Sequence, residues 1–463
     1  MEDADQDVQG LTSLPTEVLS QILMYVDGSD IPALQQTCQT LRSVTMARQF
    51  WYNRIHRLCQ EHVVSPPEEE LEEYSIAELE HWTMRRIRAR NTCPAKIQIR
   101  TRDVYGGDTL LVPGGRWLLS PYDDRIYFVD LDSNNLRMRQ LFVPKICVPF
   151  TWFRKKIGHR IWLDHKAPRL SFRFQGCIAD TEGDPPFTWV YIYQVDLIGH
   201  GANATLVAQI IATFQCPKAR KPRYLIAFND RYFIQGRGYQ SLITDGGLEI
   251  FEYRQALGCS RYPKLMDSHT LPFSEDCSTH LEFINDDVLA IYCDVTDTYH
   301  IFNIESPTSF KLLHEIKLPV LPFDFSRTYW TPEASLMTFT SSPISSTIKR
   351  IYGLVIPHDS KLHPWTVELG TFAGSRIDAR ITFEPGIFVS LSYNSKTSTI
   401  SRLVHKWDYT CESSCGGPTP ISYLEQDVDV GQLEKLVAFD EDTGRSIYFS
   451  KGGPRKFEIA VAG

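Results

Sequence analysis

The hydrophobic pattern of the chain changes near residue 93. Before this point apolar residues recur at a helical period, and from about residue 95 onward short β-branched and aromatic runs alternate with Gly, Pro, Asn and Asp turns. A single compact core is not expected for a chain of 463 residues with two such different parts. The sequence therefore predicts an α+β chain of more than one domain, a small helical unit followed by a large all-β body.

Strand-like runs recur along the whole second part. Seven pairs are separated by roughly 45–65 residues, a spacing typical of repeated four-stranded sheets. They lie around residues 115–131, 191–197, 248–253, 299–304, 348–355, 399–404 and 444–449. For residues 95–463 we therefore predict a β-propeller of about seven blades, within a range of about six to eight.

The charge balance excludes two classes of partner. The sequence has 48 Lys and Arg residues against 56 Asp and Glu residues, a formal net charge of −8. No overall positive field is available to hold nucleic acid or an anionic membrane. The apolar runs also fall far short of the roughly 20 residues that a bilayer span requires. We therefore expect no nucleic-acid partner and no membrane.

The cysteines and the N-terminal residues indicate an intracellular protein. Eleven cysteines are scattered along the chain without the density of disulfide-stapled secreted domains, so we interpret them as reduced thiols. The first residues are acidic and lack the positive and apolar regions of a signal peptide. We expect a disordered acidic tail over residues 1–10 and a location in the cytoplasm, the nucleus or both.

Three short helical stretches are predicted between residues 11 and 60. Apolar residues recur in them at helical spacing. They are residues 18, 19, 22, 23 and 26, then Leu34, Cys38 and Leu41, and then Trp51, Ile55 and Leu58. Pro15 and Asp30 suit the starts of the first two helices. A core this small is marginal unless another polypeptide covers its apolar rim.

This pattern resembles the F-box, the module that docks onto the Skp-type adaptor of cullin-RING ubiquitin ligases. The resemblance rests on Leu14-Pro15-x-Glu17-Val18-Leu19-x-x-Ile22-Leu23, Asp30-Ile31-x-x-Leu34-x-x-x-Cys38-x-x-Leu41-Arg42 and Phe50-Trp51. It gives the module the bounds 11–60. Ile31 stands where Leu is commoner in the family, and we expect it to fill the same packing role. An unrelated helical bundle with the same spacing is the alternative.

The resemblance divides the apolar residues of the module into two sets. It implies an adaptor-binding surface made of Leu14, Pro15, Ile31, Leu34, Cys38 and Trp51. It leaves an internal core of Leu19, Ile22, Leu23 and Leu41. We interpret the Cys38 thiol as a small apolar group and not as a nucleophile. The implied partners are a Skp-type adaptor and, through it, a cullin.

Residues 61–94 are predicted to form a helical linker. Residues 65–73 have the Pro and Glu content of a loop that leads into an acidic helix, and Ser75 and Glu78 are spaced as a capping box. An apolar stripe follows at Ile76, Leu79, Trp82 and Ile87. The basic residues near the end, Arg85, Arg86, Arg88 and Arg90, complement the helix dipole. This charge pattern predicts a solvated spacer helix rather than a nucleic-acid patch.

The repeats of the β part are degenerate. Gly-His and Trp-Asp pairs occur once each, at 199–200 and 407–408, whereas Val-Asp-Leu at 129–131 and 195–197 resembles the end of the third strand of a WD repeat. Double glycines are too irregularly spaced for kelch repeats, so we favour WD-like repeats. Two segments, Pro113 to Leu119 and Ala438 to Arg445, resemble parts of fungal F-box proteins with such a β region.

No catalytic motif is present in the sequence. It lacks a Gly-x-Ser-x-Gly elbow, a Walker loop and a His-Glu-x-x-His motif. Cys411 and Cys415 have the spacing of half a zinc site, but no matching pair follows them. Acidic pairs and triplets at 123–124, 286–287 and 440–442 lie in turn contexts, where Asp stabilises the turn itself. We expect no catalytic residue, no cofactor and no metal.

For target binding we single out four residues, Arg231, Tyr232, Arg237 and Tyr239, because Arg and Tyr dominate binding hot spots. Ordinary strand edges are the alternative at these positions. The sequence thus predicts a non-catalytic substrate-recognition subunit of an SCF-type ubiquitin ligase, whose F-box binds the adaptor and whose propeller binds an unknown protein target. The alternative is a β-propeller hydrolase, such as a glycosidase with two carboxylates, or a scaffold with a ligase-independent helical module.

Overall fold

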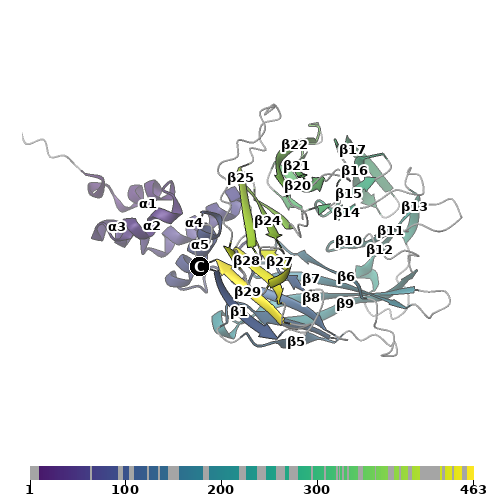
Figure 1. The fold of residues 1–463 in the computed structure, drawn as a ribbon, viewed down its shortest axis with the longest axis horizontal. Helices are drawn as coiled ribbons and strands as arrows, with labels where there is room; N and C mark the ends of the chain where they lie inside the picture. Colours follow the sequence, from purple (N-terminus) through teal and green to yellow (C-terminus); the bar gives the residue numbers. More distant parts are fainter. Residues whose placement is uncertain are drawn as a thin grey trace, which may run out of the picture.

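A small helical unit lies beside a large β body in the computed structural model (Figure 1). The structure describes residues 10–62, 65–91, 97–103, 109–122, 125–133, 136–143, 156–180, 187–217, 226–236, 247–256, 266–270, 280–293, 296–306, 309–319, 322, 324–325, 328–330, 333–341, 348–359, 361–373, 380–384, 387–394, 399–406, 428–429, 433–440, 443–450 and 456–462. Of the predicted acidic tail, all but Gly10 lies outside these residues. No helix formed by the described residues has the length and apolar character needed to span a bilayer.

Five α-helices and two short 3-10 turns make up the helical unit. They are η1 (Leu11–Ser13), α1 (Thr16–Met24), η2 (Gly28–Asp30), α2 (Ile31–Gln35), α3 (Gln39–Thr45), α4 (Arg48–His62) and α5 (Ile76–Asn91). Helix α1 begins directly after Pro15, and α2 has Pro32 in its first turn, because a residue without an N–H is tolerated there.

The prediction of one continuous second helix is wrong. The chain leaves the helix after Gln35 and resumes at Gln39, with Cys38 in an extended conformation between α2 and α3. The Thr37 hydroxyl donates to the Leu34 carbonyl at 2.8 Å, and such side-chain bonds compete with the helical ladder. The Cys38 Sγ then accepts from the Leu41 N–H at 3.5 Å and caps α3.

The two predicted helix caps have different outcomes. The Asp30 side chain makes no capping bond to α2; instead Asp27 accepts from the Ser29 N–H at 2.8 Å and caps the preceding η2 turn. The capping box of α5 is confirmed. The Ser75 N–H donates to Glu78 Oε2 at 2.7 Å, and the Glu78 N–H donates to Ser75 Oγ at 3.3 Å.

The described residues of the β body form seven separate antiparallel sheets. Six of them follow the order of the chain. These are β2 (Leu110–Leu111), β3 (Trp117–Tyr122), β4 (Arg125–Asp130) and β5 (Arg139–Phe142); β6 (Lys156–Leu163), β7 (Ser171–Asp180), β8 (Phe187–Ile198) and β9 (Thr205–Pro217); β10 (Ile226–Phe228), β11 (Tyr232–Gly236), β12 (Gly247–Glu252) and β13 (Met266–Thr270); β14 (His280–Phe283), β15 (Val288–Cys293), β16 (Thr298–Ser306) and β17 (Ser309–Lys317); β18 (Asp324–Phe325), β19 (Tyr329–Trp330), β20 (Ala334–Ser341), β21 (Ile348–Pro357) and β22 (Trp365–Ala373); and β23 (Arg380–Glu384), β24 (Ile387–Asn394), β25 (Thr399–Lys406) and β26 (Val428–Asp429).

The seventh sheet joins the two ends of the β body. It holds β27 (Leu433–Asp440), β28 (Arg445–Ser450) and β29 (Lys456–Ala462), and its fourth strand is β1 (Ile97–Asp103). The register runs from Ile97 opposite Ala462 to Asp103 opposite Lys456. The first strand of the β body is therefore held by the last one.

The seven predicted strand-like runs fall one into each sheet. Six of them belong to the third strand of their sheets, β4, β8, β12, β16, β21 and β25, and the last belongs to β28. Both Val-Asp-Leu segments lie at the ends of such third strands. These strands were the easiest to predict because they have strand neighbours on both sides and apolar side chains fill the spaces between sheets.

Apolar side chains pack between sheets that follow one another along the chain. Phe142 stacks on Tyr193 with ring centroids 3.7 Å apart, which joins the β2–β5 sheet to the β6–β9 sheet. Phe214 and Phe251, 5.3 Å apart, join the next pair in the same way. Further clusters join the β10–β13, β14–β17 and β18–β22 sheets, and Ile447 of β28 packs against the β2–β5 sheet. The core is thus divided among the interfaces between neighbouring sheets.

Candidate functional site

The core of the helical unit contains residues from both predicted sets. Leu19, Leu23 and Leu41 lie in it, with at most 6% of each side chain exposed. Ile31 and Trp51 are also fully buried there, at 0% exposure, although the sequence analysis assigned them to the adaptor surface. Trp51 lies edge-on to Phe50, and α5 covers the same core with Leu79 and Trp82. A partner cannot reach Ile31 or Trp51 in this arrangement.

An exposed apolar ridge is made of Val18 and Ile22 on α1 and of Leu14 just before the helix. The side chains are 37–39% exposed, and Val18 and Ile22, four residues apart, lie on the same face of α1. Ile22 was predicted to lie in the core. It is exposed because the apolar stripe of α1 is wider than the surface that faces the core. Only the side of the stripe with Leu19 and Leu23 is buried.

The remaining residues of the predicted adaptor surface lie around this ridge or are partly covered. Pro15 is exposed directly before α1. Leu34 and Cys38 are half-buried and pack against the helical core. Leu11 is 49% exposed before the ridge. The surface that a partner can reach is therefore centred on α1.

The segment before α5 is buried, in contrast to the solvated linker that the sequence predicted. Glu68 and Glu69 are 6% and 1% exposed, and Arg86 of α5 is 1% exposed. The Leu170 N–H of the β body donates to the Glu68 carbonyl at 2.7 Å. Glu68 lies 3.6 Å from Arg86 Nη2 of α5, whereas Glu69 meets Arg116 of the β body. The buried charges are thus paired, and the partner of Glu69 lies outside the linker.

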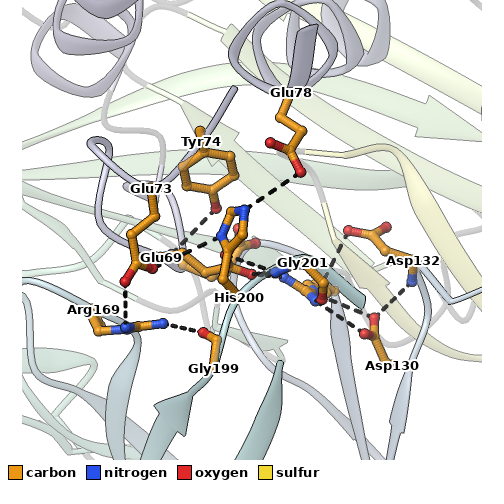
Figure 2. Close-up of polar contacts among 12 residues, drawn as sticks. Glu69, Glu73, Tyr74, Glu78, Asp130, Asp132, Arg169, Gly199, His200 and Gly201 are labelled. Atoms are coloured by element: carbon orange, nitrogen blue, oxygen red, sulfur yellow. Dashed lines mark hydrogen bonds and ion pairs between the residues drawn. The ribbon is translucent and has the colours of Figure 1, made fainter. Parts of the chain in front are cut away.

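The carboxylate of Glu69 is the centre of this junction (Figure 2). Its Oε1 accepts from Arg116 Nη1 at 2.5 Å, and its oxygens lie 3.1–3.2 Å from the Gly201 N–H. His200 Nδ1 is bonded to the second oxygen. Glu69 therefore ties the linker to two turns of the β body, the one before β3 and the one between β8 and β9.

Arg116 completes the charge balance around Glu69. Its guanidinium donates to both oxygens of Asp130, at 3.2 and 3.1 Å, and to the Gly201 carbonyl at 2.8 Å. Burial alone would lower the pKa of Arg116, but its hydrogen bonds to Asp130 and Glu69 and the charges of Asp130 and Glu68 raise it above its usual value. Arg116 is thus a permanent cation between two buried carboxylates.

A second group of charges fastens α5 beside this centre. Asp132 accepts from Arg85 Nη1 of α5 at 2.8 Å and from Arg445 Nη2 of β28. Burial alone would raise the pKa of Asp132, whereas the charges of Arg445 and Arg85 hold it well below its usual value. Burial lowers the pKa of Arg445 to about 10. Helix α5, the β4–β5 turn and β28 therefore share one charged contact.

Two segments of the β body meet beside this charged contact, Pro113 to Leu119 and Ala438 to Arg445. They are the two for which the sequence suggested a likeness to fungal F-box proteins. The Gly114 N–H donates to Asp440 Oδ1 at 3.1 Å, and Arg445 Nη1 donates to the Gly115 carbonyl at 2.5 Å. Asp440 also accepts from the Thr443 N–H at 3.0 Å, which is the turn-stabilising role predicted for it. Gly114 and Asp440 lie 326 positions apart in the sequence.

Glu69, Glu73 and His200 offer ligand atoms within 4.8 Å of one another, a spacing that a metal ion can use. The charges around them favour a different role. Glu69 already accepts from Arg116 and the Gly201 N–H, and Glu73 lies 3.0 Å from Arg169 Nη1. A divalent cation at this place would lie close to both guanidinium groups. We therefore interpret the cluster as an ion-pair network.

The four residues singled out for target binding do not form a described site. Arg231 is exposed, but its guanidinium lies 4.8 Å from the Tyr232 ring and its Nε donates to Glu252 at 2.7 Å. Tyr232 is buried. Arg237 and Tyr239 lie outside the described residues, as do Cys411 and Cys415. Target binding through these residues stays a prediction.

Sequence reasoning missed the residues of the junction. Glu69 was grouped with an acidic loop, Arg116 with a strand start, and His200 with a degenerate repeat mark. The sequence carried one signal for the Arg116–Asp130 pair. Arg116 directly precedes a predicted strand, and Asp130 lies in the Val-Asp-Leu segment that ends the neighbouring strand of the same hairpin. No local pattern in the sequence predicts the role of Glu69, because its partner His200 lies 131 residues away.

The acid dependence of stability is a testable property of this junction. Because the pKa of Asp132 is lower in the folded chain than in the unfolded chain, its contribution is complete above about pH 5 and is lost as the pH falls through the folded value. We expect Asp132→Asn to destabilise the protein at pH 7 and to differ progressively less from the wild type below about pH 4. Urea unfolding at several pH values measures this difference. An equal difference at neutral and acidic pH would contradict the assignment.

Comparison with known proteins identifies the helical unit. Residues 11–57 match the family model described as F-box-like, so the chain has an F-box-like domain at this place. F-box domains typically bind Skp-type adaptors. The curated proteins contain no significant match to the sequence.

Several solved structures resemble the chain at low identity. A structure of prolyl endopeptidases is 11% identical, covering 89% of this chain and 50% of that chain, with a TM-score of 0.41. A streptogramin B lyase is 9% identical over 81% of this chain and 100% of that chain, with a TM-score of 0.39. A functionally unknown protein from Desulfotomaculum acetoxidans is 8% identical over 74% and 89% of the two chains, with a TM-score of 0.36. Likenesses at this level carry no conclusion about function.

Proposed function

We propose that this chain is the non-catalytic substrate-recognition subunit of an SCF-type ubiquitin ligase. Its F-box-like domain binds a Skp-type adaptor and, through it, a cullin, while the β body binds a protein target in the cytoplasm or nucleus. The observation that carries the proposal is the F-box-like domain together with the exposed ridge of Leu14, Val18 and Ile22. A row of apolar side chains on one helix suits docking into a groove of another protein.

We further propose that the seven sheets are the blades of a WD-like propeller of the kind found in fungal F-box proteins. Three observations support this arrangement. Sheets that follow one another along the chain share apolar cores, β23 lies beside β27, and β1 pairs with β29. Pairing of the first and last strands within one sheet is what a ring of blades needs to hold its ends together.

The junction supports a division of labour between the two parts. Glu69, Arg116 and Asp130 form buried ion pairs that cross from the linker to the β body. A ligase subunit needs its adaptor-binding and target-binding parts at a fixed separation, since the effective concentration of target lysines depends on it. A buried junction meets this need better than a flexible linker.

Co-purification with the adaptor tests the proposal. We expect the full chain to retain a Skp-type adaptor and the Leu14→Ala, Pro15→Ala double variant to lose at least about tenfold in affinity, because both side chains are exposed beside the ridge. Leu362→Ala, which removes a 54% exposed side chain from the β body, is the matched control and should bind as the wild type does. Unchanged binding of the double variant would contradict the proposed docking surface. Hydrolase activity that survives deletion of residues 1–60 would favour the alternative function.

A further inference from the structure

Strand β9 is the last strand of its sheet and has strand β8 on one side only. In an antiparallel sheet, alternate residues of such an edge strand direct their N–H and C=O groups away from the sheet. Within the described residues, no backbone hydrogen bond joins residues 205–210 to anything but β8. The outer side of β9 is thus a template to which another strand can be added.

The composition of β9 distinguishes it from the other edge strands. Its 13 residues, TLVAQIIATFQCP, contain no Asp, Glu, Lys or Arg. Every other edge strand of four or more residues in the described part of the body, β1, β5, β6, β13, β14, β17, β22, β23 and β27, carries at least one of these residues. Charges on edge strands discourage the addition of a further strand. Among these edge strands, only β9 has no charged residue to discourage the addition of another strand.

Two apolar side chains of β9 are exposed, one on each face of the sheet. Val207 is 46% exposed and lies opposite Asp196, whereas Ile210 is 40% exposed and lies opposite Tyr193. Residues 196 and 193 are an odd number apart on β8, so their side chains point to opposite faces. A strand added beside β9 would therefore find an apolar neighbour on both of its faces. A charged group lies at the Thr205 end of this stretch, where Arg139 Nη1 of β5 donates to Thr205 Oγ1 at 3.4 Å.

The usable length of the edge selects the kind of occupant. The register of β8 and β9 shifts between Tyr193 opposite Ile210 and Ile192 opposite Ala212, which leaves Ile211 as an extra residue. The bulge divides β9 into two regularly paired stretches, 205–210 and 212–217, and the first offers about 20 Å of uninterrupted strand at about 3.3 Å per residue. Such a contact buries on the order of 400 Å², far less than the roughly 1,200 Å² of a stable protein–protein interface. This area suits a short extended segment rather than a second copy of the chain.

We propose that residues 205–210 of β9 bind a short, extended and uncharged segment of the target protein as an added strand, with an apolar side chain on each of its faces. Backbone hydrogen bonds to the outer side of β9 supply affinity, and Val207 and Ile210 select apolar neighbours. The inference rests on the proposed function, because it names the class of target segment that the β body recognises.

Fluorescence anisotropy on the full chain tests the proposal. The probes are three labelled heptapeptides of threonine in which positions 3 and 6 are both valine, both isoleucine or both leucine, three residues apart as Val207 and Ile210 are. We expect at least one to bind the wild type, and the Val207→Lys, Ile210→Lys double variant to bind it at least about tenfold more weakly, since edge lysines oppose strand addition. Leu312→Lys is the matched control, because Leu312 lies on the edge strand β17 with the same 46% exposure as Val207. It should leave binding unchanged.

A backbone-modified probe separates strand addition from simple apolar contact. The same peptide with an N-methyl group on every residue cannot donate along either of its edges, so we expect it to lose binding. Equal binding of the methylated peptide, equal binding by the double variant, or no binding of any of the three peptides to the wild type would overturn the proposal. A dimer of the wild type that the double variant abolishes in sedimentation would assign the edge to a second copy instead. Adaptor co-purification by the double variant should be unchanged, so failure here is distinct from failure of the proposed function.

Discussion

Arg116→Met should destabilise the junction of the linker and the β body by about 3–5 kcal/mol, the usual result of removing one partner of a buried ion pair. The substitution keeps most of the volume of the side chain but leaves two carboxylates without their cation. The side chain of Glu69 is 0% exposed and that of Asp130 is 5% exposed, so water cannot replace the lost partner. The remaining donors, such as the Gly201 N–H, satisfy only part of this charge.

Hydrogen exchange is the most direct measurement for this variant, because a chain of several sheets need not unfold in one step. The amides of Gly201 and Leu170 donate across the junction, to Glu69 and Glu68, and should exchange faster in Arg116→Met. Arg169→Met is the matched control. Its guanidinium pairs with Glu73 at 3.0 Å, but the two side chains are 23% and 34% exposed, so we expect a loss of less than about 1 kcal/mol. Equal effects of the two substitutions would show that the buried pair is not the main contact of the junction.

The Val18→Glu, Ile22→Glu double variant should lower the affinity for a Skp-type adaptor at least about 100-fold, or about 2.7 kcal/mol. Both side chains belong to the exposed ridge of α1, and docking would have to bury two unpaired carboxylates. The fold should be preserved because neither side chain belongs to the helical core. Surface binding kinetics with purified adaptor measure the loss.

Two substitutions elsewhere control for the added charge. Leu312→Glu and Leu362→Glu, combined in one variant, introduce the same charge at positions that are 46% and 54% exposed on the β body. Adaptor binding by this control should equal that of the wild type. If the α1 variant also binds like the wild type while keeping its thermal stability, the ridge is not the docking surface.

Local patterns predicted the elements of this protein well. The Ser75 and Glu78 capping box lies at the start of α5 as the spacing indicates, and the apolar residues Leu79, Trp82 and Ile87 of its stripe face the helical core. In the β body, each predicted run of β-branched and aromatic residues is part of a strand. These features depend on neighbours within a few residues, so periodicity is sufficient to find them.

Which face of an element is covered was harder to predict. The stripe of α1 includes both Leu19 and Ile22, yet the first is fully buried and the second is exposed. Ile31 and Trp51 had been assigned to a surface and lie in the core. When the apolar stripe of a helix is wider than its contact with the core, the packing of the other helices, here α4 and α5, decides which of its residues are buried.

The sequence by itself determined the division of this protein at about residue 93, the helical period of the first part and the repeated strands of the second, because these properties follow from the spacing of apolar residues. Only the tertiary structure decided that Glu69, Arg116 and Asp130 form one buried centre and that, among the described strands, the uncharged β9 lies at the edge of its sheet. The physical reason is that the energy of a charge or of a strand edge depends on what lies beside it in space. Those neighbours come from turns and strands far away in the chain.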